Sequence, residues 1–102
     1  MKPTAADRFV RNSLCAGDII RNGTFTRVDD PTERQWCHTV TGFGRDHEGC
    51  SDNLVYTTFD DGVDDRYGSW MSFGNIAAVL YQVTSTVERN GVVIWANGKE
   101  VA

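Results

Sequence analysis

The chain has 102 residues, of which 40% are hydrophobic and 24% are charged, and its formal net charge is −4. This length fits one domain, and the apolar content is sufficient for a folded core, which argues against intrinsic disorder. A negative chain disfavours nucleic acid as a general partner, because such proteins neutralise phosphates with lysine and arginine. No run approaches the roughly 18 apolar residues that cross a bilayer, so we expect a cytoplasmic protein with no membrane partner.

The first predicted element is a helix over residues 4–14. Thr4 can cap it, and Asp7 stands at the third helical position, as in a capping box. The dipeptide Asn22-Gly23 follows, within the strand-like residues 18–28. Asn-Gly is the commonest signal for a tight hairpin, because both central residues must take positive φ. The sequence therefore predicts a first strand pair that turns at Asn22-Gly23.

The middle of the chain alternates turn-forming and strand-forming segments. Proline and carboxylates predict a turn, and β-branched and aromatic residues with alternating polarity predict strands. The turn is expected at residues 29–32 and the strands at residues 35–43, 54–59 and 69–73. Two polar segments, residues 44–53 and 60–68, are expected to be exposed loops near one end of the sheet.

The last quarter of the chain is ambiguous between helix and strand. Apolar residues fall at helical spacing from Ile76 onward, but residues 83–87 are rich in β-branched side chains, which lose freedom in a helix. We favour a strand over residues 78–89. Asn90-Gly91 then predicts a hairpin, and Asn97-Gly98 predicts a last turn before a short edge strand at residues 99–102.

From residue 17 to residue 80 the order of elements resembles an SH3-like small barrel, as seen in chromatin-type, ribosomal and phage neck modules. The matching features are Gly17-Asp18-Ile19-Ile20, the strands at 36–43 and 54–59, the turn Asp60-Asp61-Gly62, and Ser69-Trp70 leading into residues 75–79. This resemblance implies a barrel and names no activity, because the fold hosts many unrelated functions.

We therefore expect one mainly β (α+β) domain over residues 1–102. It comprises one short N-terminal helix at 4–14, a barrel-like core at 17–80 and a C-terminal hairpin at 81–102. The core is either a small antiparallel β-barrel or a strongly twisted sheet. An exposed edge, such as that of the last hairpin, could pair with a second copy and make a homodimer.

Cysteine and histidine residues supply the ligand types that zinc prefers, but their spacing is poor. Adjacent Cys37 and His38 point to opposite faces of a strand, so only one of them could join His47 and Cys50, with Cys15 completing the site. The same residues show no positioned base and no oxyanion site for nucleophilic catalysis. We expect no metal, no cofactor and no catalytic residues.

The densest charge in the chain is acidic and lies beside aromatic residues. These carboxylates lack the alternate spacing of a calcium loop, while tryptophan and tyrosine dominate interface hot spots. The residues predicted to bind a partner are Asp60, Asp61, Asp64, Asp65, Arg66, Tyr67, Trp70 and Tyr56. With a motif-poor sequence, this cluster favours a non-enzymatic module that binds a protein.

The predicted module is similar to phage and mobile-element accessory proteins that inhibit or adapt a host protein. In that case its compartment is the cytoplasm of the host cell. Three alternatives stay open: a virion neck or tail adaptor, a small zinc-binding protein, and a nucleic-acid or nucleotide-binding barrel. The last requires six arginines to gather on one surface, namely Arg8, Arg11, Arg21, Arg27, Arg34 and Arg45.

Overall fold

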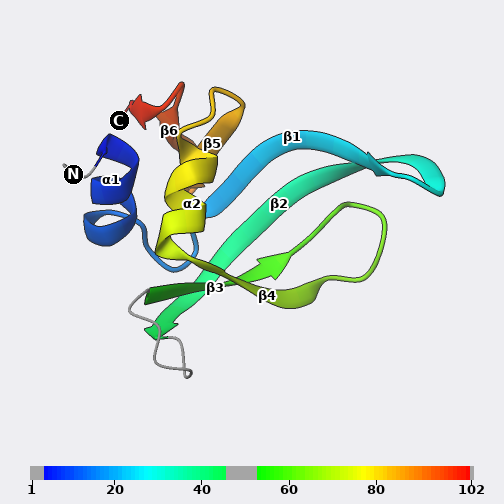
Figure 1. Cartoon of the computed structure of the whole chain (residues 1–102), viewed down its shortest axis with the longest axis horizontal. Helices are drawn as coiled ribbons and strands as arrows, with labels where there is room; N and C mark the ends of the chain where they lie inside the picture. The colour runs from blue at the N-terminus through cyan, green and yellow to red at the C-terminus, as the bar shows by residue number, and fades with distance from the viewer. Residues whose placement is uncertain (1–3, 46–52, 102) are drawn as a thin grey trace.

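The computed structural model describes residues 4–45 and 53–101, which contain two helices and seven strands. They follow the order α1 (Ala5–Asn12), β1 (Ile19–Arg27), β2 (Asp30–Arg45), β3 (Asn53–Phe59), β4 (Tyr67–Ser72), α2 (Phe73–Leu80), β5 (Ser85–Arg89), β6 (Val92–Ala96) and β7 (Lys99–Glu100). The strands form one antiparallel sheet in the order β4-β3-β2-β1-β5-β6-β7 (Figure 1). The mainly β fold is confirmed as an open sheet, so the barrel alternative is wrong, and the chain has a second helix.

Helix α1 begins where its cap was predicted. Asp7 donates its backbone N–H to the Thr4 hydroxyl at 3.1 Å, and the Asp7 carboxylate accepts the Thr4 backbone N–H at 2.9 Å. This capping box satisfies two of the amide groups that a helix start leaves without partners. The helix ends at Asn12, two residues before the predicted end. Its inner face buries Phe9 and Val10.

The predicted hairpin at Asn22-Gly23 is wrong, because β1 runs through this dipeptide to Arg27. The pairing with β2 shifts register between Arg21 and Thr24, and Gly23 takes φ 65°. Such an extra residue in one strand is a β-bulge, for which glycine is suited. The chain turns instead at residues 28–29, and most of the predicted turn at 29–32 belongs to β2. Figure 1 shows the resulting long β1–β2 hairpin extending beyond the helices.

The strand predicted for residues 78–89 is only half correct, because its first part lies in α2. Ser72 caps this helix and accepts the backbone N–H of Asn75 at 3.1 Å. Helical spacing then places Ile76, Ala77 and Leu80 on the face that enters the core. Burial of that face stabilises the helix as far as Leu80, whereas the β-branched residues that follow keep their strand preference. Those residues form β5.

The last two Asn-Gly dipeptides form turns as predicted. Asn90 and Gly91 take φ of 52° and 80°, and Asn97 and Gly98 take 54° and 75°. Positive φ at both central residues is what a tight hairpin with right-handed strand twist requires. The edge strand predicted at residues 99–102 is present in part, as β7 at Lys99–Glu100.

Both helices pack on the same face of the sheet. The buried cluster combines α1 and α2 with strand residues that include Ile20, Val87 and Trp95, and the rings of Phe9 and Trp95 lie 4.8 Å apart. Trp95 is fully buried, and its indole N–H donates to the Leu80 carbonyl at 2.9 Å. We call this side the helix-covered face and the other side the helix-free face. No helix within residues 4–45 or 53–101 is long and apolar enough to cross a membrane.

Candidate functional site

The helix-free face of β1–β4 carries a groove of about 360 Å³. Residues opposite each other in antiparallel strands share a face, so the register places the lining side chains on one side of the sheet. They are Ile19, Arg21, Gln35, Cys37, Thr39, Thr58, Asp60 and Arg66. The sequence predictions included Asp60 and Arg66 but missed the groove, because its members come from separate strands.

Two ion pairs flank this groove. Arg66 Nε lies 3.1 Å from Asp60 Oδ2, and Arg21 Nε lies 3.3 Å from Glu88 Oε1. The Arg66 side chain is 74% exposed, so this pair adds little stability and is free to exchange partners. Positive and negative groups therefore stand together at the surface of the groove, which suits a partner with mixed polar groups.

Cys37 is buried and lines the groove on the helix-free face. Burial raises the pKa of its thiol, which disfavours the thiolate that catalysis and metal binding need. His38 lies on the opposite face, with Nδ1 2.7 Å from the Thr57 hydroxyl, and burial lowers its pKa to about 4. His47 and Cys50 lie outside the described residues. Within residues 4–45 and 53–101, no three His, Cys, Asp or Glu side chains are grouped to hold a metal.

Next to the groove, Tyr56 and Trp70 form an aromatic pair on the same face. The two residues are directly opposite in the register of β3 and β4. Trp70 is 61% exposed, whereas Tyr56 is half-buried. The Tyr56 ring also covers the backbone of Gly44, since a Cβ built there would meet the ring at 2.5 Å. The glycine thus lets Tyr56 lie flat against β2 and leaves Trp70 outermost.

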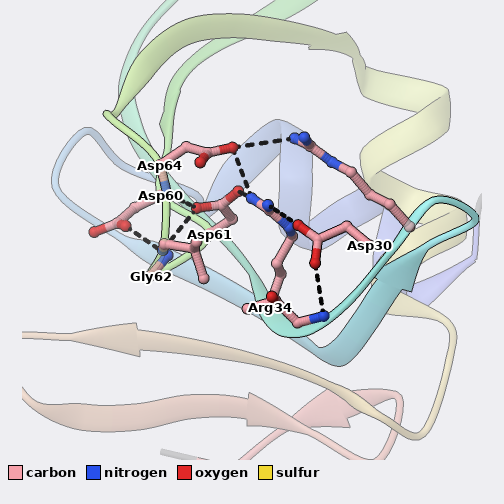
Figure 2. A network of polar contacts seen from close by, with 9 residues as sticks. Asp30, Arg34, Asp60, Asp61, Gly62 and Asp64 are labelled. Carbon is pink, nitrogen blue, oxygen red and sulfur yellow. Dashed lines mark hydrogen bonds and ion pairs between the residues drawn. The ribbon is translucent and has the colours of Figure 1, made fainter.

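The acidic loop after β3 is anchored by one buried arginine (Figure 2). Arg34 is 4% exposed, and its Nη1 donates to Asp61 at 2.6 Å and to Asp64 at 2.7 Å. Its Nη2 donates to Asp30 at 3.0 Å. Arg34 Nε has no hydrogen-bond partner among the described residues. The arginine therefore ties the loop to the start of β2, as charge-assisted hydrogen bonds of this kind can.

Asp61 also organises the loop through its backbone. Its second carboxylate oxygen accepts the backbone N–H groups of Val63 and Asp64 at 2.9 and 2.8 Å. These bonds, with the Arg34 contact, lower the pKa of Asp61 to about 2. Asp61 is therefore a structural carboxylate, held inward and 4% exposed.

The predicted binding residues are consequently divided between the two faces. Asp60, Arg66, Tyr56 and Trp70 lie together on the helix-free face. Asp61 and Asp64 contact Arg34, and Tyr67 packs near Phe59 on the helix-covered face with ring centroids 5.4 Å apart. Asp65 is exposed in the loop.

The expectation that loops 44–53 and 60–68 lie near one end of the sheet is wrong. β2 ends at Arg45 and β3 begins at Asn53, whereas the acidic loop follows the other end of β3. One antiparallel strand carries its two flanking loops at opposite ends. Most of loop 44–53 lies outside the described residues.

The arginines do not gather into one basic surface. Arg34 is buried, Arg27 lies 3.4 Å from Asp64, and Arg21 lies beside Glu88. Arg8 and Arg11 belong to α1, which packs on the helix-covered face. Carboxylates thus neutralise three of the six arginines that a nucleic-acid surface would need.

A second ion pair, which the sequence did not predict, joins buried Asp18 to the partly exposed Arg89. Asp18 is 1% exposed and accepts from Arg89 Nε and Nη2, both at 2.9 Å. It also accepts the backbone N–H of Cys15 at 2.8 Å, while Arg89 donates to the Ser13 carbonyl at 2.6 Å. These bonds fix the connection between α1 and β1 against β5.

Comparison with known proteins identifies no relative: no family model, no curated protein and no solved structure matches the chain.

Proposed function

We propose that the protein is a non-enzymatic protein-binding module that contacts its partner through the helix-free face of β1–β4. The observation that carries this proposal is the exposure of Trp70 beside Tyr56, on a sheet face that neither helix covers. An exposed tryptophan on a rigid strand provides a large contact area at a small cost in side-chain entropy.

The groove supplies the polar part of the same contact surface. Its ion pairs place Arg66, Asp60 and Arg21 around a hollow next to the aromatic pair. Protein interfaces commonly combine an aromatic centre with a polar rim. The proposed partner is accordingly a folded protein with an apolar patch over Trp70 and both acidic and basic groups facing the groove.

This proposal moves the contact from the acidic loop to the sheet face. Asp61 and Asp64 are engaged by Arg34, so they support the loop instead of offering free charge. Asp65 and Asp60 remain at the surface at either side of the loop. An inhibitor or adaptor role in a phage or mobile element is the finer form of the proposal, and the partner's identity would test it.

Site-specific photo-crosslinking tests the proposed surface. A photoreactive amino acid replaces Trp70 in one variant and Tyr81 in a matched control, because both aromatic side chains are strongly exposed, at 61% and 69%. Tyr81 follows α2, on the other side of the molecule from the groove. In cells that make the protein, we expect position 70 to yield one discrete protein adduct and position 81 to yield none.

Substitution variants supply the second arm of this test. Trp70→Ala and Arg66→Glu should weaken binding of the captured protein, whereas Tyr81→Ala should leave binding unchanged. Equal crosslinking from positions 70 and 81, or binding that is indifferent to Trp70→Ala, would rule out the helix-free face as the contact surface.

A further inference from the structure

The two edges of the sheet are protected very differently. One edge is β7, which has two residues, both charged, Lys99 and Glu100. The other edge is β4, with six residues that include no charge and no proline, Tyr-Gly-Ser-Trp-Met-Ser. Natural proteins guard exposed edges with charges, proline, bulges or very short strands. The edge at β4 has none of these features.

We propose that β4 pairs antiparallel with β4 of a second copy of the chain, forming a two-fold dimer with one continuous sheet. This edge borders the helix-free face that we assign to the protein partner, and Trp70 belongs to both: its backbone is part of the edge, and its side chain lies on that face. The register of β4 on β3 supports the pairing, because it is unbroken from Leu54 opposite Ser72 to Phe59 opposite Tyr67. Within residues 4–45 and 53–101, no strand pairs with the outer side of β4.

Symmetry and side-chain size together select one register for the dimer. A two-fold axis perpendicular to the sheet pairs residues of the same face, so a residue on the axis faces its own copy. With Ser69 on the axis, Trp70 faces the partner's Gly68 on the helix-free side. Tyr67 faces the partner's Met71 on the helix-covered side. In this register the serine meets the same serine of the second copy and the glycine lies under a tryptophan ring. The two bulkiest side chains, Trp70 and Tyr67, therefore do not face one another.

The space that this register needs is present. A Cβ built on Gly68 would meet nothing within 4 Å, so the surface above this glycine is open. A tryptophan ring lying there would cover it as Tyr56 already covers Gly44 within the chain. Aromatic cover of an edge glycine is a recognised way to stabilise a sheet. The opposed Tyr67 and Met71 add a favourable sulfur–aromatic contact.

Charge makes β4 the surface at which a second copy meets the least repulsion. The chain carries a net charge of −4, so two copies repel one another over most of their surfaces. β4 is the exception, because all of its residues are uncharged and like charges do not face one another across the axis. A foreign strand would require its own complementary sequence, whereas β4 is complementary to itself in the register centred on Ser69.

A cysteine placed on the axis tests the register. Directly opposed residues in antiparallel strands have Cα atoms roughly 4.5–5.5 Å apart, within the range for a disulfide. We expect Ser69→Cys, in a background of Cys15→Ser and Cys50→Ser, to form a covalent dimer under mild oxidation. Tyr67→Cys is the control, because the two copies of residue 67 would lie about 13 Å apart, four residues along the strand.

Sedimentation equilibrium of the otherwise unmodified chain tests the dimer itself, up to about 1 mM because a single-strand interface is small. Ser69→Lys places two positive charges on the axis and should raise the dimer Kd by roughly fivefold or more. Thr26→Lys adds the same charge on β1 and should leave Kd within about twofold, since β1 is three strands from β4 in the sheet and the charge does not lie on the two-fold axis. Circular dichroism establishes that each variant is folded.

Three results would overturn the proposal. A chain that stays monomeric throughout this range would leave a foreign strand as the occupant of the edge. A dimer that Ser69→Lys and Thr26→Lys affect equally would use another surface, as would a dimer in which the Tyr67→Cys variant crosslinks more readily than the Ser69→Cys variant. Crosslinking at Trp70 separates the two proposals by the mass of the adduct, because an adduct with a second copy of the chain supports this edge, whereas an adduct with a different protein supports the helix-free face as the partner surface.

Discussion

Lowering the pH from 7 to 5 should destabilise the protein through one buried histidine. His38 is 6% exposed between the rings of Trp36 and Phe59, whose centroids lie 4.5 and 4.6 Å from its own. Burial lowers its pKa from 6.5 to about 4, because the charged imidazolium would lose its hydration. The folded chain therefore holds His38 neutral at a pH where the unfolded chain protonates it.

The direction and size of the effect follow from this difference in proton binding. Between pH 6.5 and pH 4 the unfolded state binds more protons, so stability falls as the pH decreases through this window. At about 1.4 kcal/mol for each pKa unit, the chain should lose roughly 2 kcal/mol of unfolding free energy at pH 5 relative to pH 7. The carboxylates of Asp30 and Asp61, with pKa values of about 2, stay ionised over this range.

Urea denaturation at pH 7, 6 and 5 measures this loss. His47→Gln serves as the background, so that His38 is the one histidine that titrates. In this background His38→Gln should remove most of the pH dependence, because glutamine does not ionise. Equal losses of free energy in both chains, or an NMR titration that places the folded pKa of His38 near 6.5, would contradict this role for His38.

Two further predictions concern stability. Arg34→Met should cost about 3–5 kcal/mol in urea denaturation, because it leaves the buried Asp61 carboxylate without its ion pair; Arg66→Met, at an exposed pair, should cost less than about 1 kcal/mol. Equal costs would contradict the structural role of the buried arginine. Gly44→Ala should lower the melting temperature, because the added methyl group meets a tyrosine ring at 2.5 Å. Gly42→Ala, where a Cβ meets nothing within 4 Å, should have little effect, and the opposite order would place the ring elsewhere.

Local signals predicted the elements whose stabilising contacts are themselves local. The capping box of Thr4 and Asp7 lies within four residues. The turns at Asn90-Gly91 and Asn97-Gly98 depend only on the positive φ of those residues themselves. Asn22-Gly23 is the same dipeptide, yet it forms a bulge because β1 pairs with β2 on one side and with β5 on the other. The β5 partner lies far along the chain, since Asn22 is opposite Ser85, so a local signal could not distinguish the bulge from a turn.

The candidate site was predictable in composition but not in arrangement. Aromatic enrichment drew attention to Trp70 and Tyr56, of which the structure leaves Trp70 exposed and Tyr56 half-buried. The acidic run was less informative, because the arginine that holds Asp61 lies 27 residues earlier in the chain. The groove likewise depends on strand register, which places Cys37 beside Arg21 and sends the adjacent His38 to the other face.

Strand β1 has a consequence for how the whole chain folds and unfolds. It joins the meander β1–β4 to the C-terminal strands, since Ile20 lies opposite His38 on one side and Val87 on the other. Local hairpins can form early, but the β1–β5 contact must wait until distant parts of the chain meet, which slows folding. Once made, that contact leaves neither half with a complete core of its own, so the domain should melt in a single cooperative transition.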